Sequence, residues 1–167
     1  MRSIGLLMRE HRLIEQAIPV MKKETERLEK THELNNEWIS SIADFFKTYA
    51  DKLHHGKEEN ILFNELKKKT ISKEHETIMN NLIKDHEKAR LTIKSLIKTK
   101  DYKEAIKLLN TLIDLYPKHI ETEDKQFFFP IIKYFNSKEQ DELYNTSIEF
   151  DKQFIHKKYQ ELLNQLK

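Results

Sequence analysis

Apolar residues recur every three or four positions along most of this chain, and this period constrains the fold more than any other feature. The segment from Met79 to Ile97 shows it most clearly. Such a period is that of an amphipathic α-helix, whereas a half-buried strand alternates every second residue. Only two glycines and three prolines occur in 167 residues, so few turn signals are available. The sequence therefore predicts an all-α protein.

The apolar stripes divide the chain into four long helices and one further helix. Ser72 is the expected N-cap of the third helix, and Ser137 with Gln140 is the expected capping box of the fifth. We expect the first four helices to form an up-and-down antiparallel bundle over about residues 4–135, within a single domain of residues 1–167. The expected helices run from about residue 3 to the high 20s, then over 33–68, 72–97, 102–135 and 138–166.

Composition excludes several kinds of site and partner. The chain has no cysteine, which excludes disulfides, thiolate metal ligands and an iron–sulfur cluster of its own. A net charge of +2 with interleaved signs gives no argument for a nucleic-acid partner. Residues 1–10 lack the apolar core of a signal peptide, and the apolar run 127–132 is too short to span a bilayer. We expect a cytoplasmic protein without a membrane partner.

Two halves of the chain repeat one pattern of metal-binding residue types. In each half, one helix carries a single His on its apolar face, and the next helix carries a His with a Glu four residues later. Residues four apart share one face of an α-helix, and bundles build core sites from facing helices. A pseudo-twofold axis between the halves would unite the six side chains. They are His11, His54, Glu58, His86, His119 and Glu123.

Four imidazoles and two carboxylates suit two metal ions, with two His on each ion and both carboxylates bridging. A buried carboxylate without a partner costs several kcal/mol, and a cation supplies that partner. Imidazole with carboxylate suits Fe, Zn, Cu or Mn. The carboxylate-rich setting within a bundle favours iron, with Zn or Mn as possible substitutes.

The same motifs resemble those of hemerythrin-like proteins of the HHE cation-binding family. The resemblance implies a non-haem di-iron centre, with an oxo or hydroxo bridge, that binds or senses O2, NO or peroxide, or buffers iron. It also implies an alternative, an enzyme that reduces NO or peroxide or supplies iron for iron–sulfur repair, which would need a redox partner. The motifs are Glu10-His11-Arg12, His54-His55-Gly56-Lys57-Glu58-Glu59, Asp85-His86-Glu87, His119-Ile120-Glu121-Thr122-Glu123-Asp124 and Phe128-Phe129-Pro130.

Two positions depart from the hemerythrin pattern. Hemerythrins proper carry a further His four residues from the one on the third helix, and the chain has Leu82 and Arg90 there. The family pattern also favours Asp124, five residues after His119, as the bridging acid. Helical geometry favours Glu123 instead, at about 40° from His119 against about 140° for Asp124. We predict Glu123 as the bridge and keep Asp124 as the alternative.

Four more residues are weaker candidates. His55 lies about 100° from His54 on an α-helix, which favours a supporting or surface position over ligation. Glu59 is expected to orient a neighbour or to be solvated. Tyr116 can hydrogen-bond the centre from one turn before His119, and His156 on the fifth helix is a possible extra ligand. The rival hypothesis is a metal-free helical interaction module whose His residues only pack.

Overall fold

The computed structural model describes residues 2–167, which form helices and connecting turns without any strand. The first rod is α1 (Arg2–Thr31), and it continues through Pro19. It ends where His32 takes a positive φ of 58° and donates its backbone N–H to the Leu28 carbonyl at 2.9 Å. The all-α prediction is confirmed.

The second rod is made of four consecutive helical segments. They are α2 (Asn36–Asp44), η1 (Phe45–His55), η2 (Glu58–Leu62) and α3 (Phe63–Leu66). Asn35 caps the rod by accepting the N–H of Trp38 at 3.0 Å, so it starts three residues later than predicted. Both η1 and η2 are π-helical. A π-turn holds more residues than an α-turn, which changes the angle between neighbouring side chains.

The third and fourth rods form the second helical hairpin. The third is α4 (Lys73–Lys98), capped by Ser72 as predicted. The fourth begins with α5 (Tyr102–Thr122) and continues as η3 (Glu123–Phe127), α6 (Phe128–Ile131) and η4 (Ile132–Tyr134). The segment η3 is π-helical, as η2 is at the corresponding place of the first hairpin.

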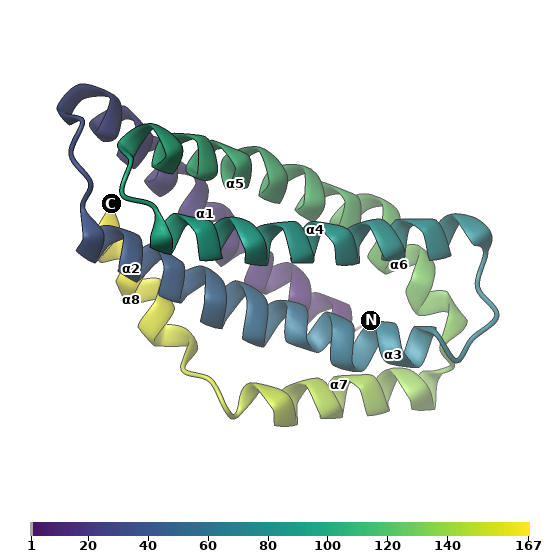
Figure 1. The fold of residues 1–167 in the computed structure, drawn as a ribbon. Coiled ribbons are helices and arrows are strands. Elements are labelled where there is room, and N and C mark those ends of the chain that lie inside the picture. The colour runs from purple at the N-terminus through teal and green to yellow at the C-terminus, as the bar shows by residue number, and fades with distance from the viewer. Residues whose placement is uncertain (1) are drawn as a thin grey trace.

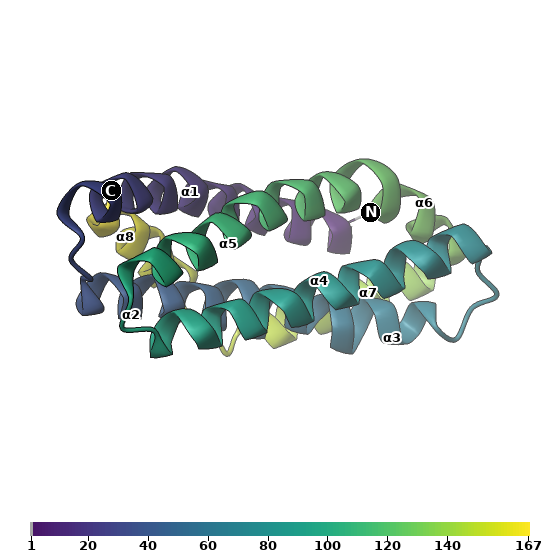
Figure 2. The ribbon, with the colours of Figure 1, turned by 45° about the horizontal axis from the view of Figure 1, so that its top comes forward.

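The four rods lie side by side as an up-and-down bundle (Figures 1 and 2). The rod α1 packs on α5, α5 on α4, and α4 on α2 and η1. Two hydrophobic clusters fill the interior. One is centred on residues such as Ile42, Phe46 and Leu112, and the other contains Ile4, Phe63 and Phe128. Burying each such side chain contributes about 1.5–3 kcal/mol. The six predicted metal-binding residues lie between the two clusters, and we call the layer that they form the polar layer.

The C-terminal part corrects the prediction of one helix over 138–166. It forms α7 (Ser137–Asp151) and α8 (His156–Leu166), separated by a turn at 152–155. The turn lets Leu143 join one hydrophobic cluster while Tyr159 and Leu163 join the other. A single straight helix could not serve both. The capping box is also one residue earlier than predicted, formed by Asn136 and Glu139.

Both C-terminal helices lie along the seam between α1 and the second rod. The helix α7 packs on α1 and η2, and α8 packs on α1, α2 and η1. A Cβ at Gly56 would lie 3.1 Å from the Phe150 ring of α7, which explains the glycine inside this helical turn. No helix within residues 2–167 is both long and apolar enough to cross a membrane.

Candidate metal centre

The structure brings the six predicted residues together in the polar layer at the middle of the bundle. Each rod contributes to it: α1 brings His11, the second rod brings His54 and Glu58, α4 brings His86, and the fourth rod brings His119 and Glu123. All six side chains are at most 4% exposed. Their residue types therefore meet in an environment where an unpaired charge is costly.

His11 and His54 form the first half of the layer. Their Nε2 atoms lie 3.0 Å apart. Glu123 Oε2 is 3.1 Å from the Nε2 of His11, and Glu58 Oε1 is 3.5 Å from the Nε2 of His54. These four residues form a group whose candidate ligand atoms all lie within 4.8 Å of one another.

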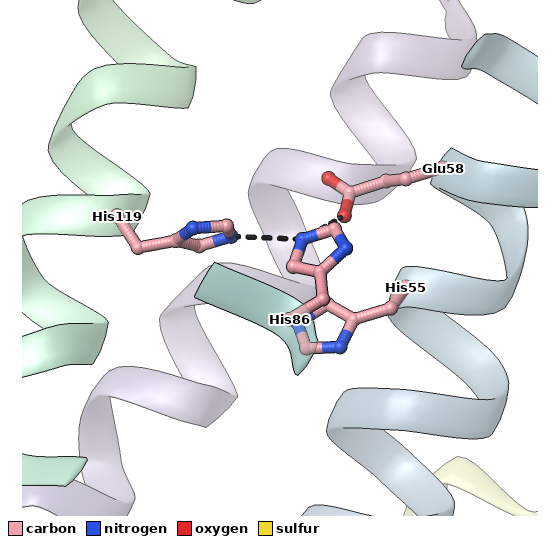
Figure 3. Close-up of side chains that lie close together, drawn as sticks. All are labelled: His55, Glu58, His86 and His119. Atoms are coloured by element: carbon pink, nitrogen blue, oxygen red, sulfur yellow. Dashed lines mark hydrogen bonds and ion pairs between the residues drawn. The ribbon is translucent and has the colours of Figure 1, made fainter. Parts of the chain in front are cut away.

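His86 and His119 form the second half in the same way, with their Nε2 atoms 3.2 Å apart. Glu58 Oε2 lies 3.4 Å from the Nε2 of His86, and Glu123 Oε1 lies 3.2 Å from the Nε2 of His119. Figure 3 shows Glu58 and His119 approaching His86. Each carboxylate thus turns one oxygen to each pair of imidazoles, so both carboxylates could be shared by two cations.

The two central carboxylates have no hydrogen bond from any of the residues 2–167. Both oxygens of Glu58 and both of Glu123 are buried in this way, although imidazole nitrogens lie within 3.5 Å of them. Leaving a buried acceptor unsatisfied costs about 1–3 kcal/mol, and more for a charged group. Two cations between the imidazole pairs would satisfy all four oxygens. The residues present therefore fit a pair of metal ions.

Each of the four imidazoles also has a carboxylate behind it, at Nδ1. Such a partner holds the proton on Nδ1 and leaves the Nε2 lone pair for a metal. The carboxylate of Asp124 lies 2.7 Å from the Nδ1 of His11, and that of Glu59 lies 2.7 Å from the Nδ1 of His86; both contacts join the two hairpins. Within one hairpin, the carboxylate of Glu10 lies 3.0 Å from the Nδ1 of His54, and that of Asp85 lies 3.4 Å from the Nδ1 of His119.

The outer carboxylates follow the pseudo-twofold pattern of the sequence. In each hairpin, the acid directly before the single His lies behind the paired His of the same hairpin. The acid directly after the central Glu lies behind the single His of the other hairpin. Asp124 therefore lies behind His11, while Glu123 occupies the centre, as helical geometry predicts. Glu59, predicted to orient a neighbour or to be solvated, lies behind His86. The roles of Glu10 and Asp85 were missed, although their position directly before His11 and His86 was a usable signal.

Burial and mutual charge separate the pKa values within the centre. Burial and the nearby charge of Glu123 raise the pKa of Glu58 well above its usual value. Burial lowers the pKa of His54 and of His86, which favours their neutral form. Burial opposes protonation of His119, but Glu123 and Asp85 together outweigh it through their charges and hydrogen bonds and raise the pKa of His119 to about 9. In the metal-free protein, bound protons therefore balance part of the negative charge of the carboxylates. Metal cations would displace these protons.

His55 lies buried beside the centre, so the surface position that we gave as one alternative is wrong. It is 1% exposed, and its ring stacks on that of His86 with centroids 3.8 Å apart. It belongs with Glu58, His86 and His119 to a second group whose candidate ligand atoms lie within 4.8 Å of one another (Figure 3). The π-helical segment η1, which ends at His55, reduces the angle to His54 that an α-helix would impose.

The other weak candidates lie outside the centre. Tyr116 is buried, with its ring parallel to His55 at 6.5 Å, but it makes no hydrogen bond to the centre among residues 2–167. The side chain of His156 is 42% exposed and lies 3.8 Å from Asp151. Together with Glu10 these two residues form a separate acidic and imidazole group, so His156 does not join the central layer.

Comparison with known proteins gives one match. Residues 2–131 match the family model described as the hemerythrin HHE cation binding domain. This range contains all six residues of the central layer and ends before α7. No curated protein and no solved structure matches the chain.

Proposed function

The chain belongs to the hemerythrin HHE cation-binding domain family, and from this premise we propose that it is a non-haem di-iron protein. The proposed ligands of one ion are His11 and His54, and those of the other are His86 and His119. Glu58 and Glu123 would be shared by both ions. The observation that carries the proposal is the set of four buried carboxylate oxygens that make no hydrogen bond within the described part of the chain, divided between two pairs of facing imidazoles.

The donor set supports iron over softer or larger ions. It contains nitrogen and oxygen but no sulfur, which suits Fe, Zn and Mn. A closed structural zinc site is usually a single tetrahedral ion, whereas this layer provides for two ions that share carboxylates. Bound iron would supply a redox-active pair of Lewis acids able to take up O2, NO or peroxide. The function that we propose is binding or sensing such a molecule, or buffering iron.

The surrounding residues support a small and uncharged ligand. The His11 ring stacks on Phe128 with centroids 5.7 Å apart, and the His86 ring stacks on Phe63 at 6.3 Å. Both Phe side chains are fully buried. They keep bulk water from the layer on the side of the second hydrophobic cluster. A low local dielectric strengthens metal–ligand and hydrogen-bond interactions there and favours an uncharged small molecule over a charged one as the further ligand.

An alternative is a di-iron enzyme that reduces NO or peroxide, or that supplies iron to damaged iron–sulfur clusters. Turnover of this kind needs electrons from a partner protein. A consumption assay with a chemical reductant separates the two functions. Stoichiometric uptake of NO or peroxide without turnover supports the binding protein, and sustained consumption supports the enzyme.

Metal analysis tests the premise of both. Protein purified without added metal, and protein titrated with Fe²⁺ under nitrogen, should hold two ions per chain. Metal-loaded protein should also melt at a higher temperature than chelator-treated protein, because an ion that binds only the native state stabilises it. Less than one ion per chain, with the same melting temperature in both states, would contradict the proposal in favour of a metal-free interaction module.

A further inference from the structure

A cavity of about 460 Å³ lies between η1 and α4, with α5 at its floor. Its inner end, lined by His55 and Arg90, adjoins the polar layer. None of the six residues of the polar layer lines the cavity. From there it follows α4 as far as Ile97 and Lys98. Its volume falls in the range of about 300–1,000 Å³ that is usual for small-molecule sites.

The body of the cavity is apolar. Phe46, Ile93 and Tyr116 line it and are at most 3% exposed. Ile97 lies at the outer end and is 44% exposed. An exposed large apolar side chain that continues a buried apolar wall favours the binding of a hydrocarbon or aromatic group.

The outer end is cationic. Lys47, Lys94 and Lys98 line it, and all three are exposed. None of them forms an ion pair within the described chain, residues 2–167. The one carboxylate that lines the cavity, Asp51, is already engaged by Arg90 at 2.7 Å and by His55 at 3.3 Å. The three ammonium groups are therefore available to an external anion.

One polar group within the cavity is also free. The hydroxyl of Tyr116 makes no hydrogen bond to any residue from 2 to 167, although the residue is buried. Burial and the charge of Asp51 raise the pKa of Tyr116, so the hydroxyl remains a donor at physiological pH. A ligand or a water molecule that enters the cavity can accept a hydrogen bond from this hydroxyl.

We propose that this cavity binds an amphipathic monoanion, namely a medium-chain or aromatic carboxylic acid. The carboxylate lies among Lys47, Lys94 and Lys98, and the apolar body lies along Ile93 and Phe46 toward His55. A neutral hydrocarbon would leave the cationic end unused, and a small inorganic anion would leave the apolar walls unfilled. The inference does not depend on the di-iron function, because the cavity and its charges exist without metal.

Calorimetric titration of the metal-free protein with decanoate tests the proposal. We expect saturable binding of one decanoate per chain and at least tenfold weaker binding of decyltrimethylammonium, which has the same chain length and the opposite charge. Absence of saturable decanoate binding, or equal affinity for the two amphiphiles, would overturn the proposal. Neither result bears on the metal content, so the di-iron function is tested separately.

Variants locate the site. Lys94→Glu with Lys98→Glu should weaken decanoate binding at least tenfold. Lys84→Glu with Lys88→Glu makes the same charge change on the same helix, outside this cavity, and should change binding less than twofold. Ile97→Asp should likewise weaken binding, whereas Leu91→Asp, at a more exposed position of α4 that does not line the cavity, should not. Equal effects of the cavity variants and their controls would refute the location.

Discussion

The buried ammonium of Lys57 offers the sharpest test of how the polar layer is held. The side chain is 1% exposed. Its Nζ contacts Glu10 and lies 2.5 Å from Asp151 of α7. Glu10 in turn accepts from the Nδ1 of His54 at 3.0 Å. A single lysine thus connects α7 to the imidazole that we assign to the first metal position.

We expect Lys57→Met to destabilise the metal-free protein strongly. Removing one partner of a buried ion pair costs about 3–5 kcal/mol, because the other charge stays buried without compensation. Two features favour the lower end of that range. The side chain of Asp151 is 17% exposed and regains some solvation, and burial already raises the pKa of Glu10, which eases its protonation. The expected loss is about 3 kcal/mol.

Urea denaturation of the metal-free protein measures this loss. With a slope of about 2 kcal/mol per molar urea, a loss of about 3 kcal/mol lowers the midpoint by about 1.5 M. Lys68→Met is the matched control, because its pair with Glu65 is 67% and 45% exposed and should contribute less than about 1 kcal/mol.

A second substitution separates charge from packing. In the double variant Lys57→Met with Glu10→Gln, the orphan carboxylate of Glu10 is gone, so part of the stability should return and the two effects should not add. The reasoning is refuted if Lys57→Met shifts the midpoint no more than Lys68→Met. It is also refuted if Glu10→Gln adds its full cost to that of Lys57→Met.

Three further predictions concern the metal centre. Glu58→Gln and Glu123→Gln should each lower bound iron from two ions to one or fewer. In the metal-free protein, Glu123→Gln should reduce stability, because the charge of Glu123 pairs with His119. Glu58→Gln should not reduce stability, and the urea midpoints of both variants check this. His55→Ala should weaken the binding of one of the two ions at least tenfold in a metal titration. His75→Ala is its control, because His75 contacts Tyr134 and belongs to no candidate ligand group among residues 2–167. Because the pKa of Glu58 is raised, metal binding should release protons, so affinity should fall about tenfold per pH unit for each proton released as the pH drops from 8 to 6. Equal affinity at both pH values would contradict this sign.

The central layer was predictable because its residues obey a local rule. On one helix face an imidazole and a carboxylate four residues apart point the same way, and the apolar stripe around them indicates which way is inward. His54 with Glu58 and His119 with Glu123 both follow this rule. The single residues His11 and His86 required the further assumption that the two hairpins are related by symmetry. The structure places all four imidazoles as that assumption requires.

The departures arise where tertiary packing changes the helix itself. Glu58 and Glu123 each begin a π-helical segment, and a hydrophobic period of 3.6 gives no sign of such a local change. The position of His55 depends on the π-helical turns that precede it, so an α-helical projection placed it too far from His54. The break after Asp151 also depends on packing, because it allows α7 and α8 to reach different hydrophobic clusters.

The two halves of the layer have matching candidate ligands but different surroundings. Behind His54, Glu10 and Lys57 connect the first proposed metal position to α7, which lies outside the family match of residues 2–131. Behind His86, the first contacts are Glu59 and the stacked ring of His55, and His55 also lines the cavity between η1 and α4. A change in the packing of α7 should therefore act mainly on the His11 and His54 position, and occupancy of the cavity mainly on the His86 and His119 position. Spectra of iron-loaded Lys57→Met and of iron-loaded protein with decanoate should consequently differ from wild type in different ways, and identical perturbations would contradict this division.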